Sequence, residues 1–167
     1  MRIFCYGLTT ILVVALAWPA LAKDYDVCVD PATDFRLDDA DGDGGFSAGD
    51  GFVAVGIIVP GGTIPDGGVA SCSDIVSTPI GTFFARGRLV IGLPAAESDD
   101  LAYVDWQFRI NGAGAIDTSG PVKVVSSGGT YYQTIVGATG GLALPIGQAL
   151  TTQLDAAGFQ IRLSVPK

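Results

Sequence analysis

The feature that most constrains this chain is a regular alternation of short β-type runs with turn clusters, which starts at Phe52 and continues to the end. Many of these runs alternate apolar with polar residues, the period of a strand with one buried face. Glycine and proline clusters separate them, and no long amphipathic helical pattern interrupts them. The pattern predicts eight or nine strands and a chain that is almost entirely β-sheet.

The longest predicted strands have two faces of different character. In the run 101–110 one face is apolar, while Tyr103, Asp105 and Arg109 fall on the other. In the run 80–93 large and small side chains alternate on one face, which is typical of the interior of a small closed barrel. Closure also removes the exposed edges that many short strands would leave. We therefore predict an all-β fold, a single closed antiparallel eight-stranded barrel.

The first 22 residues have the three parts of a secretory signal: a basic residue, an apolar run and a small-residue cleavage site after Ala22. Removing them leaves 167 − 22 = 145 residues, which is one domain by length. No second apolar stretch of about 20 residues follows. We expect a secreted protein, extracellular or periplasmic, that does not enter a membrane once the signal is removed.

The charge of the chain argues against nucleic acid as a partner. Without the signal, which carries Arg2, 8 basic residues face 17 acidic ones, a formal charge of 8 − 17 = −9. Phosphate backbones would repel a protein with this balance.

An acidic dodecapeptide, residues 39–50, has the spacing of a calcium loop. Gly44 stands where such a loop needs a sharp reversal, and the usual final Glu is replaced by Asp50. The predicted ligands, which share oxygen donors at the expected spacing, are Asp39, Asp41, Asp43, Gly45, Ser47 and Asp50. The sequence predicts calcium as the cofactor and no organic cofactor. The alternative is an acidic, glycine-rich surface turn without an ion.

The flanks of this loop do not form the helix pair of an EF-hand. Pro31 interrupts the segment before it, and the residues after it are β-branched and spaced by glycine. We predict four regions: a signal over 1–22, an irregular N-terminal segment over 23–38, the calcium-type loop over 39–50 and the barrel over 51–167.

Two cysteines remain after signal removal, Cys28 and Cys72. In an oxidising compartment they predict one disulfide, and the alternative is a pair of buried free thiols. Such a bond would stabilise the fold by about 4 kcal/mol on the chain-entropy model.

A strand ending in a glycine-threonine-glycine turn, with a further glycine opening the next strand, resembles the signature of the allene oxide cyclase and dirigent barrel superfamily. It lies in residues 135–147, and the matching positions are Gly137, Thr139, Gly140, Leu142 and Gly147. Residues 108–116, with the hairpin signal Asn111-Gly112, resemble the central hairpin of that family. The chain departs at Ala138, where the family has glycine.

The resemblance implies an eight-stranded barrel with a largely apolar cavity, assembled as dimers or trimers. Members of the superfamily include cyclases and dirigent proteins, which hold a reactive small molecule in one shape while it closes or couples. Catalysis of that kind depends on orientation and leaves little signature in sequence.

The chain contains no histidine, which excludes histidine-based triads and imidazole acid-base catalysis. The best polar cluster that remains is Tyr103, Asp105 and Arg109, on one strand face. Pointing inward these residues would orient the polar head of a ligand, and pointing outward they would form a solvated cross-strand network. The consistently apolar opposite face favours the outward alternative.

Two functions from different classes follow. The first is a secreted, calcium-stabilised barrel that accommodates a small apolar molecule, as a cyclase, an isomerase or a dirigent-like protein. The second is a non-catalytic extracellular module, structural or interacting, whose barrel is filled by its own side chains. The sequence does not decide whether the protein is an enzyme.

Overall fold

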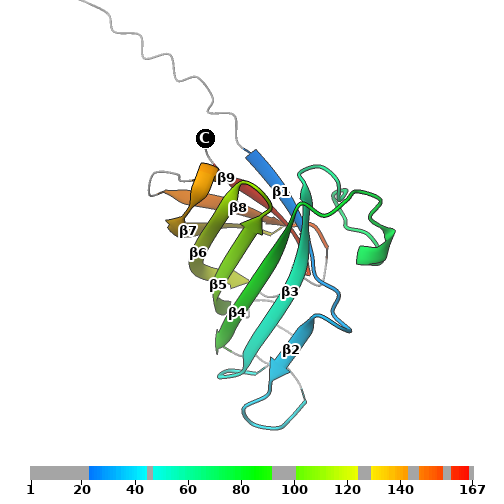
Figure 1. The fold of residues 1–167 in the computed structure, drawn as a ribbon. Coiled ribbons are helices and arrows are strands. Elements are labelled where there is room, and N and C mark those ends of the chain that lie inside the picture. Colours follow the sequence, from blue (N-terminus) through cyan, green and yellow to red (C-terminus); the bar gives the residue numbers. More distant parts are fainter. Residues whose placement is uncertain are drawn as a thin grey trace, which may run out of the picture.

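The computed structural model describes residues 23–44, 47–91, 101–123, 129–142, 147–155 and 159–165. These segments form nine strands and two short 3₁₀ helices (Figure 1). The strands are β1 (Lys23–Cys28), β2 (Phe35–Asp38), β3 (Gly51–Pro60), β4 (Gly81–Ile91), β5 (Leu101–Ile110), β6 (Gly114–Lys123), β7 (Thr130–Ala138), β8 (Gln148–Gln153) and β9 (Gln160–Val165). The helices are η1 (Cys72–Asp74) and η2 (Gly140–Leu142). No helix among the described residues is long and apolar enough to cross a membrane.

The strands form one antiparallel sheet in the order β1-β9-β8-β7-β6-β5-β4-β3-β2. A further pairing between β1 and β3 closes eight of them, β1 and β3 to β9, into a barrel. Both β1 and β2 pair with the same edge of β3: β2 pairs with Gly51 to Ala54 and β1 with Ile57 to Pro60. The predicted closed, eight-stranded antiparallel barrel is confirmed.

The prediction of an irregular segment over 23–38 is wrong, because these residues supply the strands β1 and β2. In β1 the apolar Tyr25 and Val27 point into the barrel, while Asp24 and Asp26 point out. The alternation of a strand is therefore present, but it spans few residues and half of them are charged. The barrel closes through this strand.

The Asn111-Gly112 signal forms the predicted hairpin between β5 and β6, with Gly112 at φ +69°. A second glycine turn packs against it, because the Gly141 amide donates to the Ala113 carbonyl oxygen at 2.7 Å. A Cβ on Gly114 would lie 1.9 Å from the carbonyl oxygen of Thr139, so only glycine fits there. The two turns on which the family resemblance depends therefore form one contact at the same end of the barrel.

One wall of the barrel interior is aromatic. Phe83 on β4 packs against Trp106 and Phe108 on β5, with ring centroids 5.8 and 5.1 Å away. All three side chains are buried, and they belong to the main hydrophobic cluster together with Tyr25. Rings packed in tilted and edge-to-face pairs stabilise the interior beyond the burial of their area.

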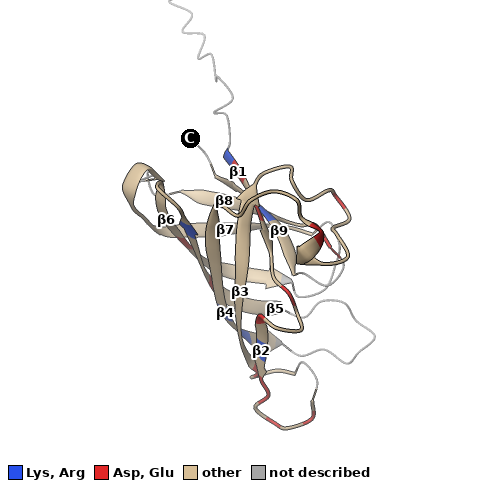
Figure 2. Ribbon diagram, turned by 45° about the vertical axis from the view of Figure 1, so that its right-hand side comes forward, with Lys and Arg blue, Asp and Glu red and all other residues tan. Residues whose placement is uncertain are grey.

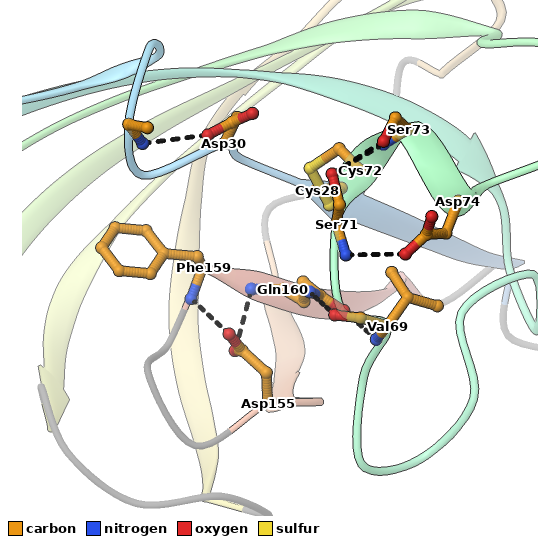
Figure 3. Close-up of a disulfide and its surroundings, with 11 residues drawn as sticks. Cys28, Asp30, Val69, Ser71, Cys72, Ser73, Asp74, Asp155, Phe159 and Gln160 are labelled. Atoms are coloured by element: carbon orange, nitrogen blue, oxygen red, sulfur yellow. Dashed lines mark hydrogen bonds between the residues drawn. A yellow bond between two sulfur atoms is a disulfide. The ribbon is translucent and has the colours of Figure 1, made fainter.

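Residues 61–80, which we name the strap, cross the outside of the barrel over β1 and β9 and appear in green beside β1 (Figure 1). The disulfide Cys28–Cys72 fastens the strap to the end of β1, as the sequence predicted (Figure 3). Ile64 and Leu154 join Cys28 in a second, smaller apolar cluster beneath it.

The strap is also held by polar groups. Asp26 is fully buried and accepts hydrogen bonds from Arg162 Nε at 2.7 Å and from the Ile64 amide at 2.8 Å. The carboxylate of Asp26 raises the pKa of Arg162. Gln160 exchanges two hydrogen bonds, both 2.7 Å, with the backbone of Val69 (Figure 3).

Candidate functional site

The acidic loop brings three of its predicted ligands together. One carboxylate oxygen from each of Asp39, Asp41 and Asp43 lies within 4.8 Å of the others. The acids follow the loop below β2 (Figure 2). The amides of Gly44 and Gly42 donate to Asp39 at 2.8 and 2.7 Å, and the Gly44 bond is the main reason that the pKa of Asp39 lies below its ordinary value.

Asp50, at the last position of the loop, bonds to the loop's own backbone. It is fully buried, and its two carboxylate oxygens accept the amide hydrogens of Ala40 at 2.8 Å and Ser47 at 2.6 Å. The hydroxyl of Ser47 donates to Asp41 at 2.9 Å. The predicted ligand Gly45 lies outside the described residues. Asp50 therefore closes the loop by holding its backbone.

The predicted polar cluster lies on the outer face of the barrel, in the outward of the two alternatives. Asp105 accepts hydrogen bonds from Arg86 at 3.1 Å and from Ser119 at 2.7 Å. Tyr103 is 54% exposed and also contacts Ser119. Arg109 is exposed and donates to Gln107, so it lies on the same face without bonding to the other two. The structure brings none of these residues into the interior.

A different set of polar side chains points into the barrel from the wall formed by β6, β7, β8, β9 and β1. Register places Tyr131 of β7 opposite Thr151 of β8, which is opposite Leu163 of β9, which is opposite Tyr25 of β1. Gln133 faces the same way, two residues along β7 from Tyr131. We name Tyr25, Thr118, Gln133 and Thr151 the interior polar cluster; each is at most 1% exposed.

This cluster is only partly satisfied by its own hydrogen bonds. The Thr118 hydroxyl donates to Gln133 Oε1 at 2.5 Å, and the Tyr131 hydroxyl donates to Gln153 Oε1 at 3.1 Å nearby. Three fully buried atoms have no partner among the described residues: Tyr25 Oη, Gln133 Nε2 and Thr151 Oγ1. Buried polar atoms in native proteins are almost always paired, so three on one wall require an explanation.

The sequence carries a signal for this cluster in the faces of β6 and β7. Gln133 shares its face with the buried Ile135, and Thr118 shares its face with the buried Ile116. A polar residue within an apolar row marks a buried polar group.

Among the comparisons with known proteins, only solved structures show similarity to this chain. No family model matches the chain, and no curated protein matches it. A structure described as "Pyocyanin demethylase" has 16% sequence identity and a TM-score of 0.59, and the match covers 87% of this chain and all of that one. A second is described as "A nonspecific heme-binding cyclase catalyzes [4 + 2] cycloaddition during neoabyssomicin biosynthesis", with 16% identity and a TM-score of 0.54. That match covers 84% of this chain and 58% of the other.

Similarity at this level of identity shows the fold, and it agrees with the predicted barrel. The relation to allene oxide cyclases and dirigent proteins stays a prediction.

The predicted cofactor, calcium with no organic cofactor, is contradicted by these comparisons. One of the similar barrels is described as heme-binding, so the absence of a cofactor motif in a sequence is no ground for excluding an organic group. The physical reason is that a barrel holds such a molecule by shape and by scattered inward contacts, which leave no motif. The comparisons lend calcium no support.

Proposed function

We propose that the barrel binds a small, mainly apolar organic molecule in its interior, against the interior polar cluster. The observation that carries the proposal is that Tyr25 Oη, Gln133 Nε2 and Thr151 Oγ1 are buried, point inward and lack partners. Leaving a buried polar atom unpaired costs about 1 to 3 kcal/mol. A ligand that supplies the missing partners offsets this cost, which explains why such groups are kept in an otherwise apolar interior.

The aromatic wall favours a ligand with a flat apolar body. Phe83, Trp106 and Phe108 present buried ring surfaces in the same cluster that contains Tyr25. Sites for small molecules typically combine apolar and aromatic walls with a few placed polar groups. A filled barrel would also bury these rings, so what favours a ligand over the non-catalytic module is the set of three unpartnered polar atoms beside them.

A cyclase, isomerase or dirigent-like activity is the finer form of the proposal. A barrel that holds a reactive molecule in one shape accelerates a reaction by orientation, which needs few ionisable catalytic groups. The interior polar cluster consists of neutral side chains, which fits chemistry of that kind. The similar fold described as a cyclase supports this form of the proposal.

Heme fits the donor set less well than a molecule held by hydrogen bonds. The chain has no histidine, and Cys28 and Cys72 are joined in a disulfide. Of the usual axial ligands of heme iron, tyrosine is the type found inside the described barrel, as Tyr25 and Tyr131. We therefore treat hemin as a probe in the test.

We also propose that the protein is exported, which the disulfide supports.

The test is to purify the full chain without detergent, denature it and identify released small molecules by mass spectrometry. We expect an organic molecule in near-stoichiometric amount, which is reduced in a Tyr25→Phe/Thr151→Val variant. The control is Tyr132→Phe/Thr152→Val, which makes the same changes on the outer face. Absence of any released molecule, with no rise in Tm on adding hemin or flat aromatic compounds, would overturn the proposal.

A further inference from the structure

The geometry points to the chemical class of the ligand: an aromatic or conjugated compound that presents a neutral carbonyl oxygen to the interior polar cluster. This inference rests on the proposed function and sharpens it. Two observations carry it, the donor inventory of the three unpartnered atoms and the charge of the surrounding buried residues.

The donor inventory selects a hydrogen-bond acceptor. The Oε1 atom of Gln133 already accepts the Thr118 hydroxyl, and the free Nε2 atom can only donate. The hydroxyls of Tyr25 and Thr151 can donate as well as accept. An acceptor on the ligand can therefore accept a hydrogen bond from any of the three groups, whereas a donor would leave Gln133 Nε2 unpaired and buried.

The register allows groups from this wall to reach one ligand. Thr151 and Tyr25 lie in one row separated by a single strand, β9, so their backbones are about 10 Å apart at ordinary strand spacing. Both side chains project into the interior, where the curvature of a closed barrel brings inward-pointing groups closer together than their backbones. Gln133 projects into the same interior from β7, the strand next to Thr151.

The charge of the interior selects a neutral acceptor over a carboxylate or a phosphate. The buried residues that the structure describes include no lysine or arginine, and the two buried acids, Asp26 and Asp50, are bonded to other groups. Lys23 lies over the ring of Tyr25, with its ammonium 5.3 Å from the ring centroid, but it is exposed. A buried anion without a buried counter-charge is costly, so a ketone, quinone, ester or lactone oxygen is the acceptor that fits.

The experiment measures binding of three naphthalene probes of similar size to the full chain by equilibrium dialysis. The probes are 2-acetylnaphthalene, a neutral ketone, 2-isopropylnaphthalene, a hydrocarbon, and 2-naphthoate, a carboxylate. We expect the ketone to bind about tenfold or more tightly than either of the others, because one or two hydrogen bonds are gained without burying a charge.

Variants test whether the preference for the ketone depends on the interior polar cluster. Tyr25→Phe/Thr151→Val should weaken ketone binding about fivefold to tenfold and leave hydrocarbon binding unchanged. Gln133 is tested in a Thr118→Val background, because removing it alone would also leave the Thr118 hydroxyl unpaired. Adding Gln133→Leu to that background should lower the ketone preference further, and Tyr132→Phe/Thr152→Val should change nothing.

The outcomes separate this inference from the proposed function. Equal binding of ketone and hydrocarbon, or a ketone preference that survives the interior variants, overturns the acceptor-oxygen inference while the binding function stands. Tightest binding of 2-naphthoate also overturns it, because the site would then take an anion. If no probe binds and the purified protein carries no organic molecule, both the inference and the proposed function fail.

Discussion

The strap buries polar groups on the outer face of the barrel wall, and the interior polar cluster buries them on the inner face. Strand β1 contributes one residue to each, and the two residues differ in their hydrogen bonding. Asp26 on the outer face of β1 is fully buried and bonded to both Arg162 and the Ile64 amide. Its neighbour Tyr25, on the inner face, is equally buried, and its hydroxyl has no partner. The chain therefore can satisfy buried polar groups where their role is structural. The proposed ligand would supply partners for the unsatisfied groups of the interior.

The largest expected effect lies in the strap. Replacing both cysteines, Cys28→Ala/Cys72→Ala, should lower the free energy of unfolding by about 4 kcal/mol on the chain-entropy model, for a sequence separation of 44 residues. Urea denaturation measures the loss. The comparison predicts that 2-acetylnaphthalene binding changes less than twofold under native conditions, since the strap lies outside the barrel. A parallel loss of binding would show that the two regions are one unit.

Asp26→Ala should cost about 3 kcal/mol, because it leaves Arg162 and the Ile64 amide without their buried partner. The estimate is at the low end for a buried pair, since the Arg162 side chain is 22% exposed and keeps its contact with Asp66. The control is Asp66→Ala, whose side chain is 89% exposed, for which we expect less than about 1 kcal/mol. Equal losses in both variants would mean that burial does not decide the strength of these contacts.

Two adjacent glycines test how closely the strap must approach β9. Gly67 and Gly68 both have positive φ, at +102° and +80°, so alanine at either position costs about 1 kcal/mol. At Gly68 a Cβ would also lie 2.8 Å from Gln160 Oε1, the atom that accepts the Val69 amide, whereas at Gly67 nothing lies within 4 Å. We therefore expect about 2 kcal/mol for Gly68→Ala and about half of that for Gly67→Ala, measured as unfolding free energies. The same loss for both would indicate that the Gln160 contact adds no stability.

The same contrast explains what the sequence could predict. The barrel follows from alternation along single strands such as 101–110, which is a local property. The strap depends on contacts between distant residues, such as Ile64 and Arg162, 98 positions apart, and no local pattern marks them. Strand β1 was missed because it is short, half charged and paired only with distant strands.

The interior polar cluster is intermediate between the barrel and the strap in how far the sequence predicts it. Its inward direction could be predicted from the face that Gln133 shares with Ile135. That Gln133 Nε2 lacks a partner could not be predicted, because it depends on which side chains come from other strands of the barrel. For the outer face, the apolar row of 101–110 was enough to favour the solvated position of Tyr103, Asp105 and Arg109.

The smallest expected effect is the sharpest test of the comparison. Thr151→Val removes a buried hydroxyl that has no partner, so the unfolding free energy of the ligand-free protein should change by less than about 0.5 kcal/mol or rise slightly. Thr118→Val is the matched control in the same cluster, because it removes the donor to Gln133 Oε1 and should cost about 1 to 2 kcal/mol. Thermal or urea unfolding of protein freed of small molecules measures both. A loss for Thr151→Val as large as that for Thr118→Val would mean that a buried water bonds the hydroxyl. The interior wall would then be satisfied in the same way as the strap, and the case for a ligand would lose its main support.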